Sequence, residues 1–197
     1  MTPVEKIIAY VGGKIPLKQF YDDVMVDLPL QELLEEAVSV PAHSDHDNLF
    51  LFMMHQNAAS AGADLDIRDA MSGYLTALGI EHRVDAAAGE NFGIVLDAAP
   101  SWLVLPGDYI GRLIDAFPPG ASRAARLKMA KARIAEDFRC LKKRPNWLQD
   151  AVWPFENSKP MVFVGQFDLA DLRHDEAQLY VFVEANGPAV RTIEQSA

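Results

Sequence analysis

The sequence predicts an α+β protein, with a mostly helical body over residues 1–143 and a small antiparallel β-sheet and hairpin over residues 144–197. In the first part, apolar residues recur three and four positions apart, as on the buried face of a helix. After Pro145 the pattern changes to the alternation of strands, in residues 161–167 and 178–184. The second part opens with a short segment, residues 145–160, that is rich in proline and tryptophan and typical of a turn-rich entry into a sheet.

The clearest helix start is at the N-terminus. Thr2 can cap the helix, Pro3 suits its first position and Glu5 completes a capping box, while Gly12 ends it. Further helical faces are expected in residues 17–24, 30–37, 49–56, 66–78, 109–117 and 122–141. A flexible loop is expected over residues 58–64, and residues 80–97 fit no single period, with residues 86–89 resembling a loop.

The last strands are expected to form a hairpin. Asn186-Gly187 accepts the positive φ angles of a type I′ turn, and residues 190–193 follow as the returning strand. Pro188 is tolerated there at a sheet edge.

Length and composition limit the class of protein. A chain of 197 residues, half of them apolar, fits a single domain over residues 1–197 or two closely packed halves. The N-terminus lacks the pattern of a signal peptide, and no apolar run approaches the roughly 18 residues of a membrane span. The single cysteine, Cys140, suits a reducing compartment, so a cytoplasmic protein without a membrane partner is expected.

The net charge of −10 is concentrated in one half of the chain. Residues 1–100 carry 16 acidic and 5 basic side chains, whereas residues 112–144 carry three acidic and ten basic ones. An acidic half disfavours nucleic acid as a partner and favours a basic protein, whose association it would accelerate. The alternative is that the charge only keeps the protein in solution.

Few residues indicate catalytic chemistry. The run His43-Ser44-Asp45-His46-Asp47 offers imidazoles and carboxylates that can bind zinc or iron, but it also suits a polar loop that caps the next helix. We expect no metal and no cofactor. Cys140 is expected on the apolar side of a helix, either as a buried thiol or with a pKa lowered by the basic residues that follow it. Trp147 and Trp153 can pack between helix and sheet or stack on a ligand.

The C-terminal part contains a motif, P-x-W-x-Q-x-x-x-W-P-x-x-N-x-K-P-M-x-F-x-x-Q, that begins at Pro145. This motif resembles the C-terminal region of bacterial immunity proteins found beside polymorphic and contact-dependent toxins, and more distantly that of YwqG-like proteins. Residues 12–34 are also similar to the first group, whereas residues 38–117 match nothing. The resemblance implies a non-enzymatic inhibitor of one toxin. The shared residues are interpreted as structural: Trp147, Gln149, Trp153, Pro154, Pro160 and Gln166.

If the chain neutralises a toxin, its acidic half is expected to supply the contact, because a toxin that acts on nucleotides or nucleic acids presents a basic cleft. The expected contact residues are Asp22, Asp23, Glu32, Glu35, Glu36, Asp45 and Asp47. Two alternatives are a metal-dependent or small-molecule enzyme that uses residues 43–47, and a structural adaptor of a secretion system.

Overall fold

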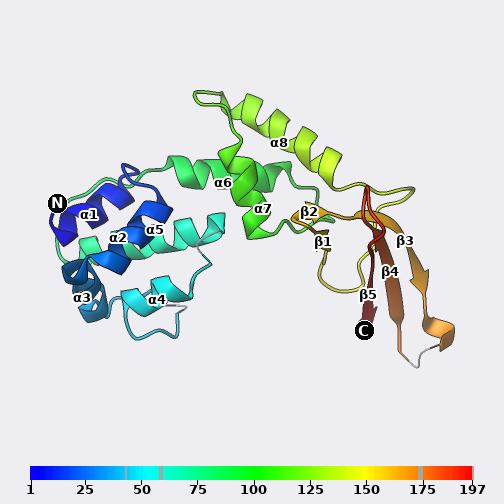
Figure 1. The fold of residues 1–197 in the computed structure, drawn as a ribbon, viewed down its shortest axis with the longest axis horizontal. Helices are drawn as coiled ribbons and strands as arrows, with labels where there is room; N and C mark the ends of the chain where they lie inside the picture. Colours follow the sequence, from blue (N-terminus) through cyan, green and yellow to red (C-terminus); the bar gives the residue numbers. More distant parts are fainter. Residues whose placement is uncertain (43, 58–59, 173–174, 197) are drawn as a thin grey trace. The chain divides into compact units, whose positions relative to one another are not determined.

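The computed structural model describes residues 1–42, 44–57, 60–172 and 175–196. In these residues, a run of α-helices is followed by short antiparallel strands (Figure 1). The predicted α+β class, with a helical body and a C-terminal sheet, is therefore confirmed. No helix in the described ranges is long and apolar enough to cross a membrane.

The helices are α1 (Pro3–Val11), α2 (Leu17–Val26), α3 (Leu28–Glu36), α4 (Leu49–His55), α5 (Ala61–Ala77), α6 (Ala87–Ala98), α7 (Gly107–Asp115) and α8 (Arg123–Asp137). The strands are β1 (Phe155–Glu156), β2 (Lys159–Pro160), β3 (Val162–Asp168), β4 (Ala177–Val183) and β5 (Val190–Ser196), with a 3₁₀ turn at Ala170–Leu172. Strands β1 and β2 form a small hairpin, and the order of the other sheet is β3-β4-β5.

The chain divides into two compact units. The first, here called the acidic unit, comprises Met1–Gly93 and Pro106–Asp115, and the second, the sheet unit, comprises Ile94–Leu105 and Ala116–Ala197. Each unit has its own buried apolar side chains, and helix α6 contributes residues to both.

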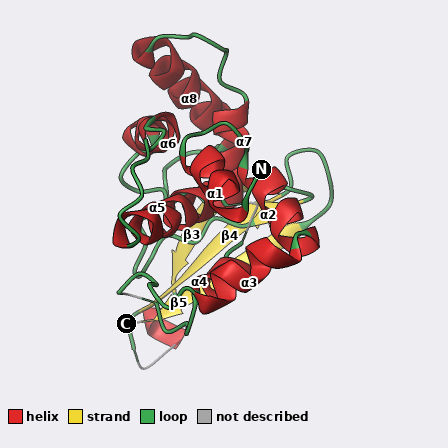
Figure 2. Cartoon of the chain, turned by 90° about the vertical axis from the view of Figure 1, so that its left-hand side faces the viewer, coloured by secondary structure: helices red, strands yellow, loops and turns green. Residues whose placement is uncertain are grey.

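The acidic unit packs helices α1 to α5 around one apolar core. The predicted capping box of α1 is present, with the Glu5 amide donating to Thr2 Oγ1 and the Thr2 amide donating to Glu5. Tyr10 and Phe20 join α1 to α2 by parallel rings whose centroids lie 4.3 Å apart. Figure 2 shows α3 and α4 lying side by side, and the Leu49 amide donates to the Ala37 carbonyl where the loop between them returns.

Two segments of this unit differ from the sequence prediction. Helix α5 begins at Ala61, so residues 61–64, expected in a flexible loop, are helical. Residues 87–89, expected as a loop, form the first turn of α6. Alanine has the highest helix propensity, and Asp85 accepts a hydrogen bond from the Ala87 amide at 3.1 Å at the start of α6. Local propensity and capping therefore outweigh the missing apolar period.

The sheet unit extends its main sheet with the residues that follow α8. Residues expected to continue this helix to position 141 instead leave it after Asp137. The Phe163 amide donates to the Arg139 carbonyl and the Leu141 amide donates to the Phe163 carbonyl, so Cys140 pairs with β3 as a parallel bridge. The prediction that Cys140 lies on a helix is wrong, because these sheet hydrogen bonds replace those of a further helical turn. Burial raises the pKa of its thiol, which disfavours the reactive alternative.

The C-terminal hairpin is confirmed and its loop contains Asn186-Gly187 as predicted, but the predicted type I′ geometry is wrong. Strands β4 and β5 pair from Ala177 with Ser196 to Val183 with Val190. Neither Asn186 nor Gly187 has a positive φ, so a type I′ turn is absent at this dipeptide. The reason is Pro188, which has no amide hydrogen to close a two-residue turn. The connection is longer and is closed by the Glu184 amide, which donates to the Ala189 carbonyl at 2.8 Å.

A two-residue turn with positive φ lies instead between β1 and β2. Glu156 pairs with Lys159, and the residues between them, Asn157 and Ser158, have φ angles of 50° and 60°. Two successive positive φ angles in a two-residue loop are the geometry of a type I′ turn, which favours asparagine. This turn accounts for the asparagine in the C-terminal motif.

Candidate functional site

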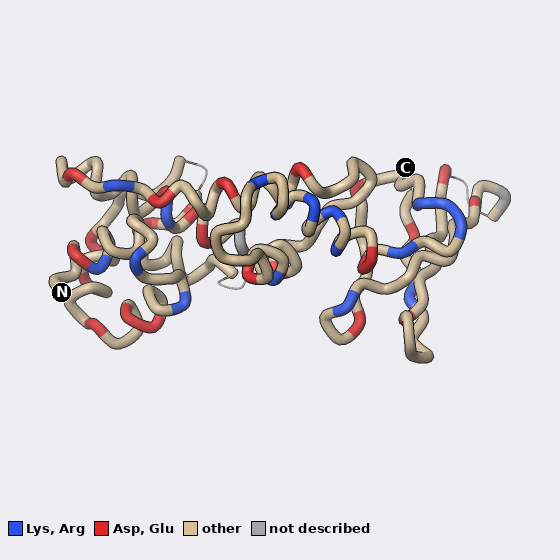
Figure 3. The backbone as a smooth tube through the Cα atoms, turned by 90° about the horizontal axis from the view of Figure 1, so that it is seen from above, with Lys and Arg blue, Asp and Glu red and all other residues tan. Residues whose placement is uncertain are grey.

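The predicted contact residues lie on neighbouring elements of the acidic unit. Asp22 and Asp23 belong to α2, the three glutamates to α3, and Asp45 and Asp47 to the loop before α4. Helix α3 packs against both α2 and α4, so the structure brings the seven carboxylates to adjoining elements. All except Asp23, which is half-buried, are exposed. Figure 3 shows the acidic positions outnumbering basic ones near the N-terminus of the tube.

Most of these carboxylates have weak or no partners within the chain. Asp22 forms an exposed ion pair with Lys18 at 2.8 Å, and Glu35 accepts a hydrogen bond from Gln31. In the described part of the chain, no hydrogen bond or ion pair engages Glu32, Asp45 or Asp47. Exposed ion pairs contribute only about 0–1 kcal/mol, so this surface is available to an external cation.

A half-buried contact holds the corner between α2 and α3. Asp27 ends α2 and caps α3, where its carboxylate accepts from the Leu30 amide. The same carboxylate lies 2.7 Å from the Lys6 ammonium on α1, and both side chains are half-buried. The hydrogen bond from Lys6 lowers the pKa of Asp27, and its reciprocal bond raises the pKa of Lys6. This arrangement, which was not predicted from the sequence, connects the corner of the acidic surface to α1 and α3.

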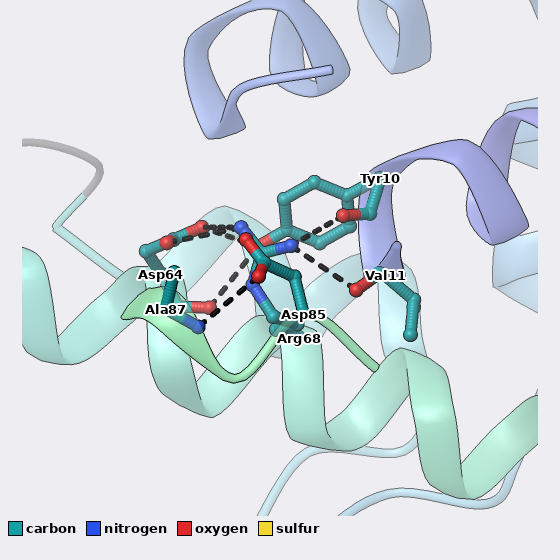
Figure 4. Close-up of polar contacts among 6 residues, drawn as sticks. All are labelled: Tyr10, Val11, Asp64, Arg68, Asp85 and Ala87. Atoms are coloured by element: carbon teal, nitrogen blue, oxygen red, sulfur yellow. Dashed lines mark hydrogen bonds and ion pairs between the residues drawn. The ribbon is translucent and has the colours of Figure 1, made fainter. Parts of the chain in front are cut away.

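A second buried group surrounds Arg68 (Figure 4). The Arg68 guanidinium lies 4.6 Å from the ring centroid of Tyr10 and donates to the Tyr10 and Val11 carbonyls at the end of α1. It also donates to both carboxylate oxygens of Asp64, at 3.0 and 3.1 Å. Burial and the Asp64 carboxylate raise the pKa of the Tyr10 hydroxyl, which donates to Asp64 at 2.9 Å. The helix α1 has no basic residue in its own last turn, and Arg68 supplies this charge from α5.

A cavity of about 450 Å³ lies beside this group. Its wall includes cationic Arg68 and Lys18 together with Asp64, Asp85 and Asp115. Asp64 already pairs with Arg68, and the rest of the wall combines Lys18, Asp85 and Asp115 with small and apolar residues, so charges of both signs line the cavity. We therefore interpret the Arg68 group as structural and the exposed acidic surface as the candidate site.

The motif residues of the sheet unit hold its loops to its sheet. Gln195 is buried on β5, and its side chain accepts from the Leu148 and Gln149 amides and donates to the Asp150 carbonyl. The side chain of Gln149 donates to the Ser196 carbonyl at 2.6 Å. The loop that contains Trp147 and Gln149 is therefore fixed along the edge strand.

The remaining motif residues make similar contacts. Trp153 is buried against Phe138, Phe163 and Phe182, and its indole N–H donates to the Met161 carbonyl at 2.8 Å. The indole N–H of Trp147 donates to the Trp102 carbonyl, and the Gln166 side chain accepts from the Asn146 amide. In the small hairpin, the Pro154 carbonyl accepts from the Met161 amide, and Pro160 pairs with Phe155.

The histidine-containing loop has no metal-binding geometry in the described residues. His43 lies outside the described residues, so its predicted alternatives are not addressed by the structure. His46 stacks on His55 with ring centroids 4.4 Å apart, and Ser44 accepts a hydrogen bond from the His46 amide. Within the described ranges, no three His, Cys, Asp or Glu side chains gather as metal ligands.

A comparison of the chain with protein-family models, curated proteins and solved structures finds no match.

Proposed function

We propose that this protein is a cytoplasmic immunity protein that neutralises a cognate bacterial toxin by forming a tight one-to-one complex. The observation that carries the proposal is the exposed acidic surface of helices α2 and α3 and the loop before α4. Its members are Asp22, Asp23, Glu32, Glu35, Glu36, Asp45 and Asp47. The resemblance of the C-terminal motif to immunity proteins supports the same function.

The physical basis is that carboxylates of this protein take the place of phosphate in the toxin. A toxin that cleaves nucleic acid or modifies nucleotides binds phosphate with a basic cleft, and exposed carboxylates can occupy that cleft in place of phosphate. Complementary charge accelerates association by 10- to 10³-fold at low salt. Glu32, Asp45 and Asp47 fit this role well, because they have no internal ion pair to break in the described structure.

The test is co-expression with the product of the adjacent gene. If the proposal is correct, that product is toxic alone, the present protein restores growth, and the two purify as a one-to-one complex. In purified proteins, reversal of Glu32, Glu35 and Glu36 to lysine should slow association by about 10-fold or more at low salt. The difference should shrink at high salt, because ions screen the attraction.

A matched control reverses the same number of charges in the sheet unit. Glu136, Asp175 and Glu176 are exposed, and their change to lysine alters the net charge equally. Under the proposal this variant associates almost as fast as the unchanged protein. Equal slowing by both variants would show that net charge alone acts, and an adjacent product that neither inhibits growth nor binds would refute the proposed function.

A further inference from the structure

The corner between helices α2 and α3 exposes apolar side chains that the core does not use. Met25 and Val26 end α2, and Leu28 and Pro29 begin α3. The exposed fractions are 62% for Met25, 82% for Val26 and 61% for Leu28. Single exposed apolar residues are common, but several adjoining ones on a folded surface indicate an interaction site.

Helical spacing places these residues in the middle of the acidic surface. Asp22 lies one turn before Met25 and Val26 on α2, and Glu32 lies one turn after Leu28 on α3. Glu35 and Glu36 follow Glu32 by a further turn. The surface therefore has an apolar centre with carboxylates on both sides, the arrangement that protein interfaces use for their central contacts and polar rim.

Contacts within the chain hold the backbone of the corner in place. Asp27, between Val26 and Leu28, is held by the half-buried contact with Lys6 and accepts a hydrogen bond from the Leu30 amide. Its own amide donates to the Asp23 carbonyl, and its carbonyl accepts from the Gln31 amide. A preorganised site loses less conformational entropy on binding and so binds more tightly.

We infer that the Met25–Pro29 corner is the central contact for a protein partner that presents an apolar pocket surrounded by lysine and arginine. Charge complementarity selects this partner over others. A second copy of the chain would oppose Glu32, Glu35 and Glu36 to the same carboxylates, and an anionic membrane or nucleic acid would be repelled. The inference depends on the proposed function only for the identity of the partner as a toxin.

The corner and its rim have different kinetic effects. Rim charges act mainly on association, whereas a desolvated apolar centre acts mainly on dissociation. Replacing Met25 and Val26 with serine should accelerate dissociation from the adjacent-gene product by about 10- to 100-fold. Association should change by less than about twofold, because no charge is lost.

The first experiment uses simple probes and needs no toxin. Amide chemical shifts of the whole protein are recorded with a helical leucine–lysine peptide, a serine–lysine peptide and a leucine–glutamate peptide. Only the leucine–lysine peptide should bind, with its largest shifts in residues 22–36. The Met25→Ser, Val26→Ser double variant should weaken this binding by about 10-fold. The control double variant, Val104→Ser with Val190→Ser, removes side chains that are 63% and 60% exposed in the sheet unit, and should bind almost normally.

Several results would overturn the inference. These are shifts centred outside residues 22–36, equal binding of the serine–lysine or leucine–glutamate peptide, or a dimer in solution that the Met25→Ser, Val26→Ser variant dissociates. The second experiment measures dissociation from the adjacent-gene product. Unchanged dissociation in the corner variant would also overturn the inference, whereas failure of the unchanged protein to bind that product would refute the proposed function alone.

Discussion

Arg68 shows how one side chain can complete an element distant in the sequence. It is only 6% exposed, and its donors are divided between the carboxylate of Asp64 on its own helix and the last carbonyls of α1. In the described structure the Nε–H of Arg68 has no acceptor. The two terminal nitrogens of the guanidinium make all four of its hydrogen bonds in the described residues. Since buried carbonyls and carboxylates are costly without a donor, loss of Arg68 should affect both helices.

The first prediction is that Arg68→Met lowers the free energy of unfolding by about 2–4 kcal/mol, because it leaves Asp64 without its cation. Chemical denaturation measures this loss. Lys18→Met is the matched control, since Lys18 also pairs with a carboxylate four positions away on its own helix but is exposed, and its change should cost less than about 0.5 kcal/mol. Adding Asp64→Asn to Arg68→Met should restore part of the stability. Equal losses in Arg68→Met and Lys18→Met would contradict the structural role of Arg68.

The sequence could not identify this group. Arg68 and Tyr10 are 58 positions apart, and hydrophobic periodicity carries no information on which polar residues will meet. The capping box at Thr2 and Glu5 was predictable because both partners lie within one turn. The corner was only partly predictable, since the helical period shows that Met25 and Val26 lie off the buried face of α2 but not that Lys6 holds Asp27.

At the scale of elements, the two candidate turns of the sheet unit show how context overrides a dipeptide preference. Asn186-Gly187 precedes a proline that cannot close the expected turn, whereas Asn157-Ser158 precedes Lys159, whose amide is available. The Asn-Gly rule locates the loop between β4 and β5 but predicts the wrong turn type for it. The strands themselves were predictable, because β4 alternates buried and half-buried positions from Tyr180 to Val183.

The second prediction concerns Asn157, which is exposed and has a φ of 50°. Asn157→Gly should leave the stability of the sheet unit within about 0.5 kcal/mol, because glycine adopts this conformation without steric cost. Asn157→Val should destabilise it by about 1–2 kcal/mol, because a β-branched residue does not. Thermal unfolding of both variants is the measurement. Equal melting temperatures would show that the turn adopts another conformation in solution.

The third prediction is a pH dependence at the corner of α2 and α3. Lys6 keeps the pKa of Asp27 below its ordinary value of 3.8, so ionised Asp27 stabilises the fold above that pH. The contribution is lost as the pH falls through the lowered pKa. Asp27→Asn should therefore be less stable than the unchanged protein at pH 7, and the difference should vanish in strong acid.

Chemical denaturation across the acidic range tests this prediction. Glu32→Gln is the control, because no hydrogen bond or ion pair engages Glu32 within the described residues, and its neutralisation should leave the shape of the pH profile unchanged. At high pH, Lys6 produces the opposite dependence. Because the pKa of Lys6 is raised above its ordinary value of 10.5, its contribution to stability is lost as the pH rises above 10.5 and through the raised pKa. A difference between Asp27→Asn and the unchanged protein that is constant with pH would indicate that only the helix cap matters.

At the scale of the molecule, fold class and charge distribution were predictable, and two halves were one alternative for the domain organisation, but the segments that make up each unit were not predictable. Periodicity distinguishes helix from strand along the chain, and counting gives the 16 acidic and 5 basic residues of the first hundred. Residues 94–105 belong with the sheet unit and residues 106–115 with the acidic unit. Such an exchange of segments depends on tertiary packing, which local patterns do not encode.

The last prediction follows from this charge distribution. A surface rich in exposed carboxylates repels itself, and salt screens the repulsion within about 10 Å at 0.1 M. The melting temperature should therefore rise as sodium chloride increases from about 10 mM to about 0.1 M. The Glu32→Lys, Glu35→Lys, Glu36→Lys variant should show a smaller rise, because it places cations among the remaining carboxylates. The variant with Glu136, Asp175 and Glu176 changed to lysine should retain the full rise, since its substitutions leave the acidic unit unchanged. A melting temperature that falls with salt would mean that attractive ion pairs such as Lys6–Asp27 outweigh the repulsion, and that the acidic surface carries no electrostatic cost for a partner to relieve.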